Sequence, residues 1–213
     1  MYIEILKDRK EAGLLLSEKL EKYQDTDTII LAVPRGGVPI GYEIAKNLNL
    51  PLDIILSKKI GHPLNKEYAI GAVSLDSTII EEHPDVSNTY IESEIKNLRA
   101  LLQENYAIYM GNRKPIDVKG KNVIVVDDGI ATGNTLLASI NMLRKNNPKK
   151  IIVAVPVVPA DVVAIFKQKA DEFIFLIAPI DFGGVGRFYE NFEQVNDDEV
   201  VRMLSVVNLM GKP

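Results

Sequence analysis

The sequence predicts an α/β protein built on a doubly wound parallel sheet, with an inserted β-hairpin and mobile loop and a small cap. Two observations indicate this fold. Short apolar runs rich in β-branched residues alternate with helical segments along most of the 213 residues. These runs are apolar without interruption, which is typical of strands buried on both faces of a parallel sheet. At this length we expect one domain over residues 1–213, with its core at about 25–180 and the cap at about 181–213.

The first elements of the chain follow a helix, strand, helix, strand order. An amphipathic helix is expected over 8–23, with Asp8 as the N-cap and Glu11 as its partner in a capping box. The next three elements are a strand, a helix and a second strand, over 28–33, 38–48 and 51–57.

The segment after the second predicted strand breaks the alternation. Residues 58–68 contain Gly61 and Pro63 and show no periodicity, so we expect a mobile loop there. The apolar runs 69–74 and 78–81 flank a short turn and predict a β-hairpin. Together these segments form an insertion between two strands of the main sheet.

The second half of the chain returns to regular alternation. A long, charged, amphipathic helix is expected over 89–110, and a linker over 115–121 leads to the next strand. Residues 181–193 are rich in glycine and aromatic side chains and predict an irregular cap. Between the linker and the cap we expect strands over 122–126, 151–155 and 172–177 and helices over 135–145 and 161–169, and after the cap a last helix over 197–208.

Composition and charge exclude several classes of protein. The formal net charge is −4, whereas coating of nucleic acid needs a large positive surface, so a nucleic-acid partner is not expected. The absence of cysteine excludes a disulfide framework, a thiolate metal site and a cysteine nucleophile. His62 and His83 lack the spacing of metal ligands. Residues 1–10 alternate apolar and charged side chains, and no apolar run approaches the ~18 residues that span a membrane, so we expect a cytoplasmic protein without a membrane partner.

The segment Val123–Thr135 carries the strongest functional pattern. It places Asp127 and Asp128 at the carboxyl end of a buried strand, where ligands of open α/β sheets bind. A turn rich in glycine and threonine then opens a helix, whose free N–H groups can bind a phosphate. Carboxylates so close to a phosphate need other partners, and ribose hydroxyls or a metal ion would provide them. The whole pattern indicates a sugar phosphate; the alternative is that the acids cap a helix and the glycines turn the chain.

Basic residues follow two other predicted strands. Pro34–Gly37 comes directly after the strand over 28–33, and its Arg35 can donate charge-assisted hydrogen bonds to phosphate oxygens. The alternative is a simple turn with an exposed arginine. Lys58 and Lys59 begin the expected mobile loop, which would exclude water from a reaction centre when it closes. Their alternative is a solvated basic pair.

Val123–Thr135 resembles the motif of type I phosphoribosyltransferases that binds 5-phosphoribosyl-1-pyrophosphate (PRPP). In that motif four apolar residues and two acids precede a short spacer and a Thr-Gly-x-Thr turn. The resemblance covers nearly the whole chain and implies a five-stranded parallel sheet with a variable hood that selects the base, drawn here from the cap, with the N-terminal part as a further candidate. Four other segments look like a subgroup of predicted phosphoribosyltransferases without an assigned acceptor: Asp8–Gly13, Pro34–Pro39, Ala69–Val73 and Val185–Phe192.

The resemblance implies a glycosyltransferase in which a ring nitrogen of a base displaces pyrophosphate from C1 of PRPP, with Mg²⁺ as cofactor. Magnesium would be held through the pyrophosphate and the ribose hydroxyls, without a direct protein ligand. Asp127 and Asp128 would hold the ribose, whereas Arg35 and Lys59 would offset charge on the leaving group. The other implied PRPP contacts are Gly36, Gly37, Lys58, Gly129, Ile130, Ala131, Thr132, Gly133, Asn134 and Thr135.

Four further expectations come from the resemblance. The turn at Pro34–Gly37 would bind pyrophosphate, often through a non-proline cis peptide bond. Enzymes that salvage 6-oxopurines usually place an acid just before the Thr-Gly pair, and Ala131 stands there in this chain, which disfavours hypoxanthine or guanine as the acceptor. Arg187 and Tyr189 are candidate acceptor contacts, unless this aromatic tail packs against the sheet edge. A homodimer is the tendency of the family.

A protein of another class shares the expected fold. Some members of the fold sense PRPP or a nucleotide and have lost turnover, and the basic loop over 58–68 favours an enzyme over such a regulator. A kinase that forms PRPP would need an ATP site and a duplicated domain, and the sequence shows neither.

Overall fold

The core of the protein is a five-stranded parallel sheet, seen in a computed structural model that describes residues 4–210. The strand order is β2-β1-β6-β7-β8, so the chain first builds outward from β1 in one direction and then from β6 in the other. Ligands of open α/β sheets bind where the order reverses, which here is between β1 and β6. The strands are β1 (Thr28–Ala32), β2 (Leu52–Ile54), β6 (Asn122–Val126), β7 (Lys150–Val157) and β8 (Glu172–Ile177).

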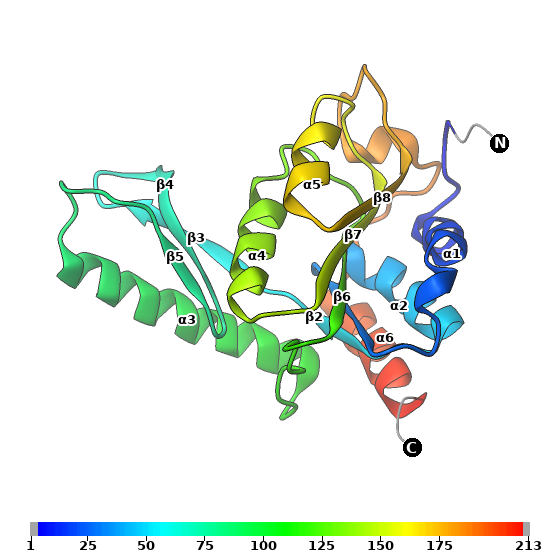
Figure 1. The fold of residues 1–213 in the computed structure, drawn as a ribbon, viewed down its shortest axis with the longest axis horizontal. Coiled ribbons are helices and arrows are strands. Elements are labelled where there is room, and N and C mark those ends of the chain that lie inside the picture. Colours follow the sequence, from blue (N-terminus) through cyan, green and yellow to red (C-terminus); the bar gives the residue numbers. More distant parts are fainter. Residues whose placement is uncertain (1–3, 211–213) are drawn as a thin grey trace.

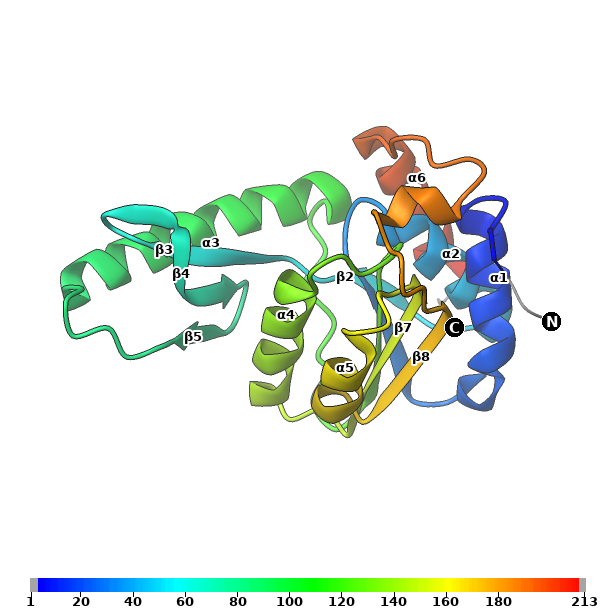
Figure 2. The ribbon, with the colours of Figure 1, turned by 90° about the horizontal axis from the view of Figure 1, so that it is seen from above.

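Helices cover both faces of this sheet (Figures 1 and 2). Alternate residues of each strand enter two separate apolar cores; in β1, for example, Ile30 packs toward one face and Leu31 toward the other. The predicted doubly wound α/β fold is therefore confirmed. One face carries α1 (Arg9–Lys19), α2 (Gly37–Leu48) and α6 (Asp197–Met210), and the other carries α4 (Asn134–Lys145) and α5 (Val163–Lys169).

An arm projects from the side of the core (Figure 1). It consists of a three-stranded antiparallel sheet, in the order β3-β4-β5, and a long helix, α3, that packs along it. The arm has an apolar cluster of its own between sheet and helix, centred on Ile60, Ile70 and Leu102. Its elements are β3 (Ser57–His62), β4 (Asn65–Ser74), β5 (Thr78–Ile80) and α3 (Asn88–Met110).

The expectation of a mobile loop over 58–68 is wrong, because most of these residues form β3 and the start of β4. The two strands pair as a hairpin, and the register shifts on both sides of Gly61. A Cβ on Gly61 would lie 2.5 Å from the carbonyl oxygen of Lys66, so this glycine permits a close approach of two backbones. The irregular pairing hides the alternation that would have predicted a strand. Residues 69–74 and 78–81 do form antiparallel pairs, as expected.

The cap is held to the N-terminal segment by backbone hydrogen bonds. Leu6 forms a parallel bridge with Tyr189, and the Glu190 N–H donates to the Leu6 carbonyl at 2.8 Å. We call residues 181–193 the hood segment; it contains one turn of 3₁₀ helix (Val185–Phe188) and no strand. The N-terminal segment therefore lies against the hood segment. Among the residues from 4 to 210, no helix is long and apolar enough to cross a bilayer.

Candidate active site

Two loops that leave neighbouring strands meet at the switch point of the sheet. Pro34–Gly37 follows β1, and Asp127–Gly133 follows β6, whose last residue Val126 is in register with Ala32. The Pro34–Arg35 peptide bond is cis, as the resemblance implied. A Cβ on Gly37 would lie 2.7 Å from the Val126 carbonyl oxygen, so the two loops are in direct backbone contact. The structure thus brings the two predicted motifs together.

Asp127 is the most perturbed acid of the site. It is partly buried at the end of β6, and its Oδ1 accepts a hydrogen bond of 2.8 Å from the Asp128 backbone N–H. Burial, and secondly the neighbouring Asp128 carboxylate, raise the pKa of Asp127 to about 8. Near neutral pH this side chain therefore carries a proton for much of the time.

Asp128 is held by a residue to which sequence reasoning assigned no role. Nε and Nη2 of Arg9 both donate to its Oδ2, at 2.9 and 2.8 Å. On the other side of the carboxylate lies Gly36, where any added Cβ would overlap the Asp128 side chain. In the sequence, Arg9 stood out only as part of Asp8–Gly13, one of the segments that resemble the phosphoribosyltransferase subgroup. That resemblance implied no chemical role for Arg9. The acid pair is thus in contact with both the N-terminal helix and the Pro34–Gly37 loop.

The turn after the acid pair, Gly129–Thr135, has a geometry that suits the binding of a phosphate, and we call it the phosphate loop. Gly133 adopts a left-handed φ of +78°, which favours glycine, and a Cβ there would lie 2.7 Å from the ring of Phe166. The helix α4 begins at the next residue, so its free N–H groups face the end of the loop. The hood covers the start of the same loop, because Val185 packs directly over Gly129. Gly129–Thr135 therefore packs against α5 at Gly133 and against the hood segment at Gly129.

A cavity of about 780 Å³ lies between this loop and the arm. Thr132, Asn134 and Thr135 line one wall, and Lys58 and Lys59 line the other. A second cavity, of about 630 Å³, lies between the base of the arm and the C-terminal half of α4. The lining of that second cavity includes no residue of the phosphate loop, so the cavity of about 780 Å³ is the one that belongs to the candidate site.

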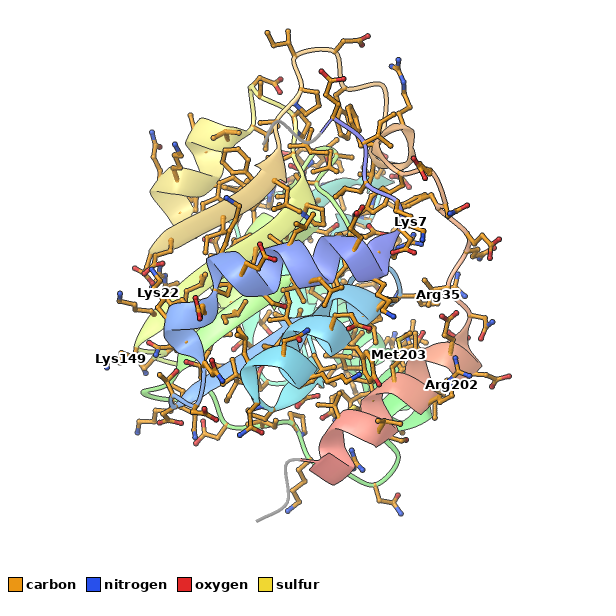
Figure 3. The ribbon with its side chains drawn as sticks, turned by 90° about the vertical axis from the view of Figure 1, so that its right-hand side faces the viewer. Lys7, Lys22, Arg35, Lys149, Arg202 and Met203 are labelled. Atoms are coloured by element: carbon orange, nitrogen blue, oxygen red, sulfur yellow. The ribbon has the colours of Figure 1, made fainter. Side chains whose placement is uncertain are left out.

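Both predicted cations for the leaving group are paired with acids in this structure. Lys59 Nζ lies 2.6 Å from Glu67 Oε2, across the β3–β4 hairpin. The Arg35 Nη1 lies 3.8 Å from Asp197 Oδ1 at the start of α6, and Figure 3 shows Arg35 at the edge between α1 and α6. Both side chains are largely exposed, so these pairs can open at small cost.

The two candidate acceptor residues have different surroundings. Tyr189 is buried, and its hydroxyl donates to the Asp128 carbonyl oxygen at 2.7 Å. Burial and the nearby acids raise the pKa of Tyr189 well above its usual range, so it stays a hydrogen-bond donor. Arg187 is exposed, and its nearest acid is Asp181 at 3.7 Å. The hydroxyl of Tyr189 is thus engaged with the acid pair, whereas Arg187 lies free to move at the surface.

The fold and the contact between the two loops at the switch point are what the resemblance to type I phosphoribosyltransferases implied, and comparisons with known proteins identify the same family. The family described as phosphoribosyl transferase domain matches residues 3–185, and the chain belongs to this family. A protein of Mycobacterium tuberculosis H37Rv named as a phosphoribosyl transferase is 36% identical over 208 residues, which cover 95% of this chain and 47% of that protein. The chain therefore spans about half the length of this relative.

A solved structure shows the same fold over nearly the whole chain. The protein TT1426 of Thermus thermophilus superposes with a TM-score of 0.83 at 34% identity, covering 94% of this chain and 97% of that one. A shorter likeness, 54% identity over 39 residues, links the chain to ribose-phosphate pyrophosphokinase of Pyrococcus furiosus, of which it covers 14%. The resemblance to phosphoribosyltransferases is confirmed at the level of family and fold.

The raised pKa of Asp127 predicts how stability depends on pH. The folded state keeps a proton on this group up to about pH 8, whereas the unfolded chain loses it near pH 4, so the folded state binds more protons in between. The contribution of Asp127 to stability must therefore fall as pH rises through this window. We expect the advantage of Asp127→Asn, which cannot ionise, over the wild type in free energy of unfolding to grow by ~3–4 kcal/mol between pH 5 and pH 8.

Urea unfolding at the two pH values measures this gain. Asp161→Asn, which replaces an exposed carboxyl in the turn before α5, is the matched control. If the advantage of Asp127→Asn stays the same at both pH values, the assignment of a raised pKa is wrong.

Proposed function

We propose that this protein transfers the 5-phosphoribosyl group from PRPP to a nitrogenous base, releases pyrophosphate and depends on Mg²⁺. The observation that carries the proposal is the contact at the switch point between three parts: the Asp127–Asp128 pair, the phosphate-binding loop that follows it, and the Pro34–Gly37 loop. PRPP has a ribose, a 5-phosphate and a pyrophosphate, and each of these groups finds a complementary part.

The 5-phosphate would bind at residues 130–135, where the N-terminal N–H groups of α4 and the hydroxyls of Thr132 and Thr135 can donate to its oxygens. The ribose hydroxyls would donate to Asp127 and Asp128. Because Asp127 is largely protonated near neutral pH, hydroxyl donors and a nearby cation would shift it to the ionised form, and PRPP binding would release a proton.

The acid pair fits the preference of Mg²⁺ for oxygen ligands. Magnesium usually binds proteins through one or two carboxylates, water and the phosphates of its substrate. Asp127 and Asp128 would hold it through water and the ribose hydroxyls. When bound, the ion neutralises charge on the pyrophosphate oxygens.

The departing pyrophosphate would be met by Arg35 and Lys59. Arg35 stands on the loop that touches the acid pair, and Lys59 lines the cavity opposite Thr132. To reach the leaving group, Arg35 must turn away from Asp197 and Lys59 from Glu67. A bend of the arm toward α4 would bring Lys59 closer to the leaving group. The arm would then provide the closing motion that was expected of a mobile loop.

The acceptor would approach from the side of the hood segment. Ala131 in the phosphate loop disfavours a 6-oxopurine, and Arg187, whose exposed ion pair with Asp181 can open, is a side chain of the hood that could contact a base. We further propose that the protein acts in the cytoplasm. Incubation with PRPP, Mg²⁺ and a panel of adenine, uracil, orotate, hypoxanthine and nicotinate, with release of pyrophosphate as the signal, tests the proposal directly.

One observation favours a second function. The ion pairs of Arg35 with Asp197 and of Lys59 with Glu67 must open before transfer, whereas a protein that binds PRPP without transferring it can keep them closed. Calorimetry distinguishes the two functions: binding of PRPP without turnover of any base in the panel favours a sensor. Failure of PRPP to bind, or equal binding to the Asp128→Asn/Thr132→Ala variant, contradicts both.

Arg35→Ala and Lys59→Ala are expected to lower turnover by ~100-fold and ~10-fold, because a fixed cation near developing charge contributes on this scale. Binding of ribose 5-phosphate should persist, since the proposed contacts of both side chains are with the pyrophosphate, which ribose 5-phosphate lacks. Steady-state kinetics and calorimetry measure the two effects. Lys167→Ala removes an exposed lysine of α5 and is the control. An equal loss of ribose 5-phosphate affinity in either variant would show that these cations serve the 5-phosphate instead.

A further inference from the structure

We propose that Arg9 is a positioning residue that fixes the Asp128 carboxylate for the ribose and couples it to the hood segment. This inference rests on the proposed function, because it assumes that the acid pair binds ribose. It assigns a role to the first residue of α1, which lies more than a hundred residues from the acid pair in sequence.

Hydrogen bonds at the N-terminus of α1 fix the backbone from which the Arg9 side chain extends to the site. Asp8 caps the helix by accepting a hydrogen bond of 2.8 Å from the Glu11 N–H, and Glu11 Oε2 in turn accepts from the Lys7 N–H at 2.6 Å. These bonds hold the backbone on both sides of Arg9. Its side chain and that of Asp128 are only 12% and 17% exposed, so their ion pair is well shielded from water.

The guanidinium group of Arg9 is anchored on its other side by the hood segment. It lies 3.9 Å from the centre of the Phe192 ring, and its Nη1 donates to the Glu193 carbonyl at 2.8 Å. Stacking of a cation on an aromatic ring and a simultaneous hydrogen bond to a carbonyl both favour the planar guanidinium group of arginine over the ammonium group of lysine. Arg9 therefore links the hood segment to the Asp128 carboxylate, whereas the Tyr189 hydroxyl of the hood contacts the Asp128 backbone carbonyl.

One oxygen of the Asp128 carboxylate is held by Arg9, and the other is available to a ligand. Its Oδ2 accepts both bonds from Arg9, and Gly36 packs against the group, so the side chain cannot rotate freely. Among residues 4–210, no hydrogen bond to its Oδ1 is formed, which leaves this oxygen for a ribose hydroxyl. Without Arg9 the carboxylate would lose both its orientation and its partner charge.

The test compares two probes, ribose 5-phosphate and inorganic phosphate, by calorimetry on the full chain. Inorganic phosphate needs only the loop at 130–135, whereas ribose 5-phosphate also needs the acid pair. For Arg9→Lys we expect ~10-fold to 30-fold weaker binding of ribose 5-phosphate and unchanged binding of inorganic phosphate. Because Arg9 acts through Asp128, the double variant Arg9→Lys/Asp128→Asn should bind ribose 5-phosphate no more weakly than Asp128→Asn alone.

Two further variants sharpen the test. Phe192→Leu should weaken ribose 5-phosphate binding by ~3-fold in the wild type and not at all in the Arg9→Lys background, because the ring acts through the guanidinium group. Arg144→Lys is the matched control, since Arg144 also pairs with an aspartate, Asp171, at 2.7 Å.

Three results would overturn the role of Arg9: wild-type affinity of Arg9→Lys for ribose 5-phosphate, an equal loss for inorganic phosphate, or additive losses in the double variant. A fourth result would contradict the proposed function as well as the role of Arg9. If the wild type binds ribose 5-phosphate no more tightly than inorganic phosphate, the acid pair does not bind ribose, and the role of Arg9 is overturned with it.

Discussion

Gly36→Ala is expected to weaken PRPP binding by at least ~100-fold while the protein stays folded. The backbone of Gly36, with φ −60° and ψ −33°, suits any residue, so alanine brings no backbone strain. Its methyl group would instead overlap the Asp128 carboxylate, which Arg9 holds in place. Either the carboxylate or the Pro34–Gly37 loop must then move, and both serve the same ligand. A shift of about 1 Å in such a group can cost a factor of this size.

Calorimetry with PRPP and Mg²⁺ measures the loss. Gly120→Asn is the control, because Gly120 lies in the linker before β6 with a left-handed φ of +73° and nothing within 4 Å, and asparagine tolerates that conformation. PRPP affinity of Gly36→Ala close to that of the wild type would show that Asp128 is not held in the orientation that binds the ribose.

Phe166→Ala is expected to lower the free energy of unfolding by ~3–5 kcal/mol, the usual cost of removing a buried phenylalanine. Phe166 is fully buried and stacks on Phe173, with ring centroids 5.3 Å apart. Its ring also supports Gly133 in the phosphate loop. The variant should therefore bind inorganic phosphate more weakly as well, since the loop loses the surface on which it rests.

Urea unfolding and phosphate calorimetry measure the two effects. Ile165→Ala, at the neighbouring position of α5, removes a side chain that is 45% exposed and should change stability by less than ~0.5 kcal/mol. If Phe166→Ala loses stability but keeps full phosphate affinity, Phe166 serves the core alone.

Most of the core could be predicted from local pattern. The bounds of β6 and β8 agree with the predicted strands at both ends, because each is a continuous apolar run, followed by Asp127 after β6 and by Ala178-Pro179 after β8. Asp8 caps α1 as expected, since the capping signal lies within four residues. The juxtaposition of Pro34–Gly37 with Asp127 and Asp128 also follows from the sequence, given that carboxyl ends of parallel strands meet at one edge.

The errors concern features that depend on distant contacts. Residues 58–68 look irregular because bulges at Gly61 interrupt the alternation, and only the packing of Ile60 against α3 shows that they are strands. The ion pairs of Lys59 with Glu67 and of Arg35 with Asp197 were not predicted, and the role of these two cations at the leaving group stays a prediction. Such exposed ion pairs have no signature in the order of residues.

The sequence by itself determined the sheet, the switch point and the acid pair with its phosphate loop, since each rests on residues that are adjacent along the chain. Tertiary structure alone decided what holds that pair. Arg9 and Gly36 come from separate parts of the chain and meet at Asp128, and Phe192, from a third part, packs on the Arg9 guanidinium group. The physical reason is that strand and turn preferences act over a few residues, whereas the partner of a buried charge is chosen by the packing of the whole fold.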